Sequence, residues 1–224
     1  MAYNDTNRPV LEIINVCMKR LGLDAVSTLD QNSLSIVAVD LLNDVVTDMC
    51  DYFQWPQLYA ETSVVAVSSV VEYKINVDAK SISEVSVSGQ VSPLELVTIE
   101  DIRRLNRITS SGIPRQFAII KVSGDASYMR VHPTPTTPLS SFEIAYYTKP
   151  RLIRASAGDG SLVFNLPARV LIQGLYAQML LEESGGRPTP EVAAASQLYA
   201  KMKQDSLNRF TFDTGSDVYI VPCR

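Results

Sequence analysis

Apolar residues recur at helical spacing near both ends of the chain. The first such stretch predicts a helix over residues 9–21, and the second predicts a longer helix over 32–53. Pro56 helps to end the second helix, because the residue before a proline avoids helical backbone. The same spacing returns over 167–184 and then over 189–209, where a threonine cap and a proline mark the start of the last predicted helix.

The middle of the chain has a different pattern, with short runs rich in Val, Ile and Thr. These runs are bounded by Ser, Gly, Asn or Pro and therefore predict β-strands. A brief helix is expected over 100–108, and Ser123-Gly124-Asp125 predicts a hairpin turn. The predicted strands are 62–67, 71–75, 82–87, 94–99, 116–122, 127–132 and 142–147.

This order of elements predicts an α+β fold, in which a helical bundle from the N- and C-terminal helices carries an inserted antiparallel β-domain. The bundle would comprise residues 1–56 and 165–210, and the β-domain residues 57–164. Residues 211–224 would form an extended C-terminal arm. The helices at the two ends can pack together only if the strands form an insertion between them.

Charge is distributed unevenly along a chain of otherwise ordinary globular composition, with 224 residues, a net charge of −4 and 46% hydrophobic residues. Residues 1–100 hold five Lys or Arg and fourteen Asp or Glu, whereas residues 101–224 hold fifteen and ten. Such an uneven distribution of charge suits oriented contacts between copies of the chain, or a channel lined by one sign of charge. Alternatively, the distribution arises by chance and the charges only lie on solvated faces. No apolar run reaches ~18 residues and the N-terminus lacks a signal-like apolar segment, so we expect neither a membrane span nor secretion.

One face of the second predicted helix carries a line of carboxylates. They are Asp40, Asp44 and Asp48, at intervals of four residues, with Asp51 close to the same line. A shared metal ion is disfavoured, because each helical turn separates the carboxylates by ~5.4 Å. Three interpretations stay open: a solvated face, an acidic wall that meets basic residues of a neighbouring copy, and a channel wall that repels passing DNA.

The brief predicted helix carries three arginines, Arg103, Arg104 and Arg107. Guanidinium groups can hold phosphate. No aromatic residues are interleaved with them and the chain is acidic, so sequence-specific DNA reading is disfavoured. We favour ion pairs within or between subunits.

His132 is the only histidine and ends a predicted strand. A general base needs an orienting partner, and the nearby Arg130 supplies none. The three cysteines are far apart and no nucleophile or zinc motif occurs, so we expect no catalytic residue, cofactor or metal site. We interpret His132 as a partly buried structural residue and Trp55 as a core residue where helices meet strands.

Three prolines follow the histidine, Pro133, Pro135 and Pro138. They remove backbone donors and fix φ, which predicts a stiff, extended loop without ladder hydrogen bonds of its own. Such a loop could be a preformed contact surface, or a rigid turn that only sets the geometry of two strands.

Three stretches carry a resemblance to a known family. They are LLNDVVTDMCDYFQWPQL, SGIPRQFAIIKVSGDASYMRVHPTPTTPLSSFEIAYYTKP and LPARVLIQGLYAQMLLEESG. Their order and spacing over roughly residues 10–210 resemble the head–tail connector, or adaptor, proteins of tailed bacteriophages, most closely the tail tubular protein A type. The residues concerned form the fold and carry no catalytic role.

The resemblance implies a structural virion protein, assembled in the bacterial host cytoplasm and located in the neck. It implies a twelvefold ring that docks under the capsid portal and continues the channel through which genomic DNA is ejected, without sequence-specific binding. The next partner would be a tail tube, a nozzle or a fibre-bearing ring.

The C-terminal residues Asp217, Val218, Tyr219, Ile220 and Val221 suggest a strand that adds to an exposed sheet edge of a partner chain. Other functions stay open. The chain could be another neck ring, such as a stopper or tail terminator, or a ligand-binding protein or enzyme with a pocket near His132 and Trp55. A general DNA-binding module would show salt-sensitive affinity, and the acidic charge argues against it.

Overall fold

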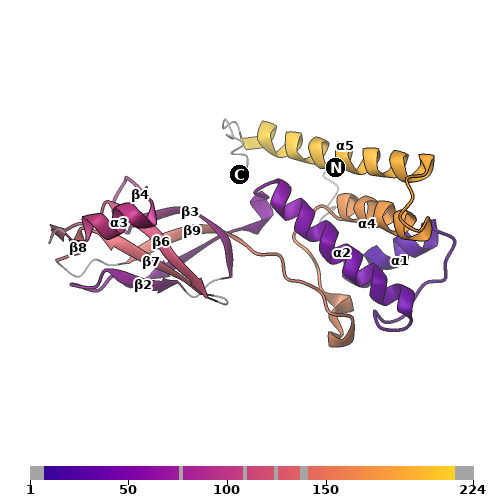
Figure 1. The fold of residues 1–224 in the computed structure, drawn as a ribbon, viewed down its shortest axis with the longest axis horizontal. Helices are drawn as coiled ribbons and strands as arrows, with labels where there is room; N and C mark the ends of the chain where they lie inside the picture. Colours follow the sequence, from indigo (N-terminus) through magenta and orange to yellow (C-terminus); the bar gives the residue numbers. More distant parts are fainter. Residues whose placement is uncertain (1–7, 76–77, 108–109, 124–125, 137–140, 215–224) are drawn as a thin grey trace. The chain divides into compact units, whose positions relative to one another are not determined.

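The computed structural model describes residues 8–75, 78–107, 110–123, 126–136 and 141–214 (Figure 1). The chain divides into two compact units, the first formed by the segments up to Gln57 and from Pro150 onward, the second by Leu58–Lys149. Residues 150–164 therefore group with the helices, whereas the sequence had placed them with the strands. Within the described residues, no helix is both long enough and apolar enough to cross a bilayer.

The first unit contains the helices α1 (Val10–Arg20), α2 (Ser33–Tyr52), α4 (Ala168–Glu183) and α5 (Pro190–Thr214). Helix α4 contacts each of the other three, and it is buried around most of its circumference from Val170 to Leu175. The start of α2 is fixed by a capping box. The Asn32 side chain accepts a hydrogen bond from the Ser35 backbone N–H, and the Ser35 hydroxyl accepts one from the Asn32 backbone N–H.

Helix α4 approaches its neighbours closely at Gly174. A Cβ atom at this position would lie 2.6 Å from Cγ1 of Val45 on α2 and 2.8 Å from Cε2 of Tyr199 on α5. Any larger residue would therefore have to displace these side chains or move α2 and α5 away from α4. Gly174 falls inside the predicted helix 167–184, and the close packing explains why glycine stands there.

The returning segment after Lys149 is held on α2 by one side chain. The amide of Asn43 donates to the Ile153 carbonyl at 3.0 Å and accepts from the Ile153 N–H at 2.8 Å. Further on, the buried carboxylate of Asp159 binds Arg151 and the backbone N–H of Arg154. This segment contains two short turns of 3-10 helix, Ala155–Ala157 and Asp159–Ser161. These bonds are the physical reason why 150–164 belongs to the first unit.

The second unit contains two principal sheets. The first has the order β1 (Tyr59–Val64), β9 (Phe142–Thr148), β3 (Ala79–Val87), with antiparallel pairs. The second has the order β2 (Glu72–Ile75), β7 (Ala126–His132), β6 (Gln116–Ser123), β4 (Glu95–Leu96), in which β4 runs parallel to β6. The short strands β5 (Ser111–Gly112) and β8 (Thr134–Pro135) form a separate parallel pair.

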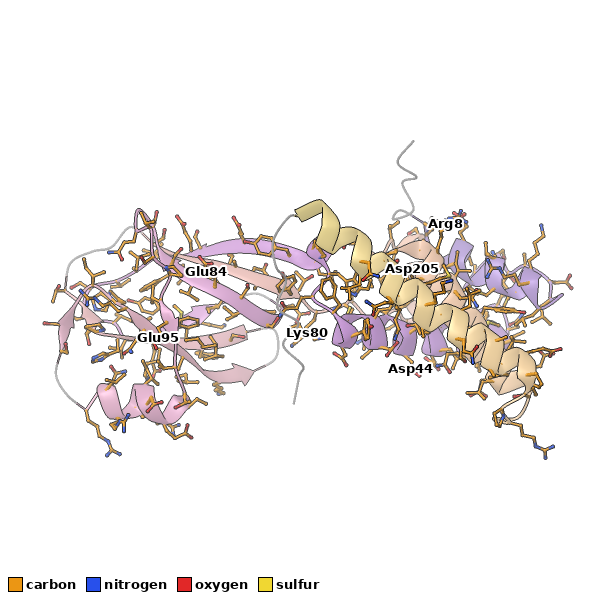
Figure 2. All side chains as sticks on the ribbon, turned by 90° about the horizontal axis from the view of Figure 1, so that it is seen from above. Arg8, Asp44, Lys80, Glu84, Glu95 and Asp205 are labelled. Atoms are coloured by element: carbon orange, nitrogen blue, oxygen red, sulfur yellow. The ribbon has the colours of Figure 1, made fainter. Side chains whose placement is uncertain are left out.

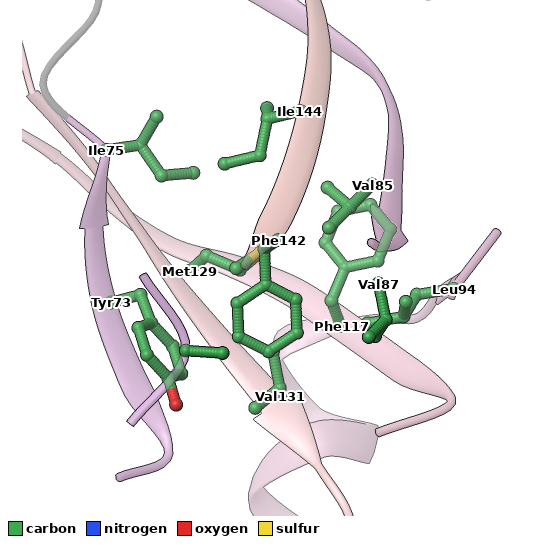
Figure 3. Close-up of a cluster of buried hydrophobic side chains, with 11 residues drawn as sticks. Tyr73, Ile75, Val85, Val87, Leu94, Phe117, Met129, Val131, Phe142 and Ile144 are labelled. Carbon is green, nitrogen blue, oxygen red and sulfur yellow. The ribbon is translucent and has the colours of Figure 1, made fainter. Parts of the chain in front are cut away.

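The two sheets pack face to face around one core (Figure 3). The ring of Phe142 on β9 lies 4.9 Å from the ring of Tyr73 on β2, in an edge-on arrangement. Alternate residues of the longer strands point into this core, as the sequence predicted, and bulges interrupt the alternation in β3 and β6. Its buried members are Ala66, Tyr73, Ile75, Val85, Val87, Leu94, Phe117, Met129, Val131, Phe142 and Ile144.

Helix α3 (Ile99–Leu105) packs on β6 and β7 through the buried Ile102. The strand predicted over 94–99 is reduced to Glu95–Leu96, because the Thr98 hydroxyl accepts the Asp101 N–H and caps α3. At the other end of the chain, α5 continues to Thr214, beyond the predicted end near Arg209. Residues 211–214 are therefore helical and not part of an extended arm. The arm beyond residue 214 lies outside the described residues.

Candidate functional site

The acidic line on α2 is exposed along its length, and one of its members, Asp48, binds the neighbouring helix α5. Asp40, Asp44 and Asp51 are exposed, and Asp44 projects from the helix in Figure 2. Asp48 accepts hydrogen bonds from the Tyr199 hydroxyl and from Lys203 Nζ, both at 2.7 Å. Asp48 therefore joins α2 to α5 within one subunit.

Lys203 is the centre of a small polar and aromatic cluster. Its Nζ lies 4.7 Å from the ring centroid of Tyr52 and 4.6 Å from that of Tyr199, and its side chain is only 12% exposed. Burial first, and then the hydrogen bond to Asp48, raise the pKa of Tyr199 well above its ordinary value. Tyr52 completes the cluster by donating to Gln204 at 2.7 Å. Sequence reasoning missed this cluster, because its two helices are more than a hundred residues apart in the chain.

The three arginines lie at the protein surface, Arg103 and Arg104 on α3 and Arg107 in the turn that follows it. Arg104 pairs with Asp101 at 2.8 Å, an ion pair within the same helix. Arg103 and Arg107 are exposed. The structure thus gives Arg104 an intramolecular partner, and phosphate or inter-subunit contacts of the three arginines stay predictions.

His132 and Trp55 lie in different units. His132 is 9% exposed, with Nδ1 2.9 Å from the Asn106 side-chain oxygen, and its carbonyl accepts from Arg115 N–H. Trp55 is completely buried and donates its indole N–H to the Met49 carbonyl at 2.8 Å. These contacts agree with the structural roles predicted for both residues.

The proline-rich loop does form ladder hydrogen bonds, contrary to the sequence prediction. Thr134 N–H donates to the Ser110 carbonyl at 3.0 Å, and the Pro135 carbonyl accepts from Ser69 N–H at 2.8 Å. Proline lacks a donor but keeps its carbonyl, so Pro135 can still join a strand from one side. Pro133 is half-buried and Pro135 is buried, whereas Pro138 lies outside the described residues, as do residues 217–221 of the predicted docking strand.

The outer faces of the two main sheets carry charges that the sequence analysis did not single out. On the first sheet, Tyr59 donates to Glu61 at 2.7 Å, and this bond is the main reason why the pKa of Tyr59 rises to about 12. On the second, Lys121 Nζ lies 5.6 Å from the ring centroid of Tyr128. Strand alternation was visible in the sequence, but the register that aligns these residues was not.

Groups that could perform chemistry do not gather in the described part of the chain. No cluster of three or more His, Cys, Asp and Glu side chains suited to a metal ion occurs among the residues that the structure describes. Cys17 is buried, its thiol donates to the Ile172 carbonyl at 3.3 Å, and burial raises its pKa to about 12. A thiol in this state is a poor nucleophile.

Comparison with known proteins supports a structural role. The family model described as SU10 adaptor protein matches residues 9–223, which is nearly the whole chain. A search of curated proteins gave no match.

Proposed function

Because the chain belongs to the SU10 adaptor protein family, which makes it a bacteriophage adaptor-type structural protein of the virion neck, we propose that it forms the ring that joins the capsid portal to the tail. The family match over residues 9–223 is the observation that carries this proposal. The ring has twelve copies and continues the DNA channel, as the likeness to tail tubular protein A-type proteins implies. Its distal partner is a tail tube, a nozzle or a fibre-bearing ring.

The packing of the first unit supports this proposal. A ring subunit beside a DNA channel needs a rigid body more than it needs a cavity. The close approach of α4 to α2 and α5 at Gly174, and the bound Lys203, provide such rigidity. The two compact units also support the description of the fold as a helical bundle with an inserted β-domain.

The C-terminal residues are the proposed portal contact. Deletion of residues 215–224 leaves all of α5 in place and removes the apolar segment around Tyr219. We expect the shortened chain to fold normally and to lose its attachment to the portal. Unchanged attachment would show that the contact lies elsewhere.

Native mass spectrometry of the purified chain, alone and mixed with the portal protein of the same phage, tests the main proposal. Twelve copies, alone or only on the portal, are the expected result. A chain that stays monomeric with and without the portal would overturn it. A ring that binds only after another neck protein has docked would identify a stopper or tail terminator instead.

A further inference from the structure

We propose that neighbouring copies dock head to tail through their second units. The outer face of the β1-β9-β3 sheet of one copy would lie against the row Lys74, Tyr128 and Lys121 on the outer face of the β2-β7-β6 strands of the next. Helix α3 covers the other end of that face, near Ala118 and His132. This inference rests on the proposed function, because it names the surfaces through which subunits of the ring meet. It is carried by two rows of side chains whose charges and spacing are complementary.

The acidic row crosses the first sheet. The register places Glu61 of β1 and Glu84 of β3 on either side of Ala145 of β9. The preceding residue, Ile144, points into the core, so these three side chains point out of the sandwich. Both carboxylates are exposed, and Figure 2 shows Glu84 on its strand. A hollow of about 400 Å³ lies over the row and is lined by all three residues.

The acidic row lies in a face of negative charge. Within their bounds the three strands carry Glu61, Glu84 and Glu143, against a single basic residue, Lys80. Glu143 lies two residues from Ala145 on β9, and therefore on the same outer face. Glu61 accepts a hydrogen bond from Tyr59 at one carboxylate oxygen, which leaves its negative charge in place.

The basic row crosses the second sheet. The register places Lys74 of β2 and Lys121 of β6 on either side of Tyr128 of β7. Met129, the next residue of β7, points into the core, so the basic row points outward. Both lysines are exposed, and Tyr128 is half-buried. The other basic residue of these strands, Arg130, is paired with Glu72.

The two rows match in spacing and in shape. Each places two like charges on strands separated by one intervening strand, so the charges of each row lie about 10 Å apart. The acidic row has alanine at its centre beneath the hollow, and the basic row has an aromatic side chain at its centre. Docking would therefore pair both lysines with both glutamates while Tyr128 enters the hollow over Ala145.

The placement of the rows predicts a ring and not a dimer. They lie on opposite outer faces of the same sandwich, because the two sheets share the core between them. Contact between different faces is heterologous, and repetition of such a contact closes into a ring when the rotation allows it. Two copies that present the same row to each other would instead place like charges together.

Charge reversal in the full chain tests this inference. One variant carries E61K and E84K, and a second carries K74E and K121E. Each variant alone presents like charges at every contact, and we expect its ring fraction on the portal to fall at least about tenfold. A mixture of the two variants, and a chain with all four substitutions, restores opposite charges and should restore the ring.

A matched control reverses the charge of two exposed glutamates of the first unit, with E182K and E183K on α4, and should leave the ring unchanged. Circular dichroism and thermal unfolding check that every variant folds. If the reversed variants form rings as the wild type does, or if the four-substitution chain fails to restore them, the inference is wrong and the proposed function stands. Loss of DNA retention without loss of the ring would assign the basic row to DNA phosphate. Failure of the wild type to form a ring, alone or on the portal, would overturn the proposed function itself.

Discussion

Glycine at position 174 has an effect opposite to that of glycine in most helices. In an exposed helix, Gly→Ala stabilises by about 0.5–1 kcal/mol, because alanine loses less backbone entropy. At Gly174 the new methyl group would meet Val45 at 2.6 Å and Tyr199 at 2.8 Å. We expect Gly174→Ala to lower the free energy of unfolding by about 1–3 kcal/mol, as overpacked cores do.

Chemical denaturation measures this change. Ser196→Ala, at an exposed position of α5, is the control and should be neutral or slightly stabilising. Adding Val45→Ala to Gly174→Ala should recover part of the loss, because the nearest obstructing atom is removed. A stabilised Gly174→Ala variant would show that α2 and α5 give way easily.

Asp44 and Asp48 occupy similar positions on α2 but have different surroundings. Asp48→Asn removes the charge that faces the nearly buried Lys203. Because the Asp48 side chain is half exposed, we expect a loss of only about 1 kcal/mol in the free energy of unfolding. Asp44→Asn makes the same chemical change one turn away and should alter stability by less than about 0.5 kcal/mol. Equal effects of the two substitutions in urea unfolding would contradict a specific role for Asp48.

Ionisation of Tyr199 in the unfolded chain should lower the free energy of unfolding at alkaline pH. Its pKa is higher in the folded protein than the ordinary value of about 10, so its contribution is complete below that pH and is lost as pH rises above it. Tyr199→Phe removes the hydroxyl, and the variant should be the less stable one at pH 7. Its disadvantage should shrink above about pH 10, where only the unfolded wild type gains from ionising this tyrosine. Urea unfolding of both proteins between pH 7 and 11 compares them, and a constant difference would contradict the assignment.

At the scale of elements, Asn43 connects α2 to the segment that returns from the second unit. Asn43→Ala removes both hydrogen bonds to Ile153, whereas Asn43→Asp keeps the acceptor for its N–H. We expect amide hydrogen exchange around Ile153 to accelerate strongly in the alanine variant and less in the aspartate variant. Equal exchange rates in the wild type and both variants would mean that other contacts hold the segment.

Local patterns in the sequence predicted most elements, and tertiary contacts explain the differences. Helices α1, α2 and α4 and strands β6, β7 and β9 lie within a residue or two of their predicted bounds, because periodicity and end signals coincide there. The expected strand 62–67 instead runs from Tyr59 to Val64, where it pairs with β9. The β5–β8 pair was missed, because two-residue strands leave no alternation in the sequence.

The candidate surfaces were less predictable than the elements. The line from Asp40 to Asp51 is visible from spacing alone, but nothing in the sequence indicates that Asp48 pairs with Lys203 of α5. The two charged rows depend on strand register, and a bulge between Ile119 and Lys121 brings Lys121 opposite Tyr128. Local patterns do not determine such a shift.

At the scale of the whole molecule, the second unit has the properties of an autonomous domain. Its first and last strands are paired, with Tyr59 opposite Tyr147, so its ends lie side by side. We expect the isolated segment 58–149 to fold and to unfold in one cooperative transition, since it contains its own core. Circular dichroism during thermal unfolding checks this, and a segment without a cooperative transition would show that the second unit needs the helices.

The pairing of β1 with β9 also determines how the molecule bears mechanical load. A pull that separated residues 58 and 149 would open the β1–β9 ladder one hydrogen bond at a time from the Tyr59–Tyr147 end, which is the weakest way to load a pair of strands. The first unit opposes this opening. The chain enters the second unit after α2 and leaves it at Lys149, and Asn43 of α2 binds the departing segment at Ile153. We therefore expect a force applied to the helices to load the two hydrogen bonds between Asn43 and Ile153 before it loads the β1–β9 ladder.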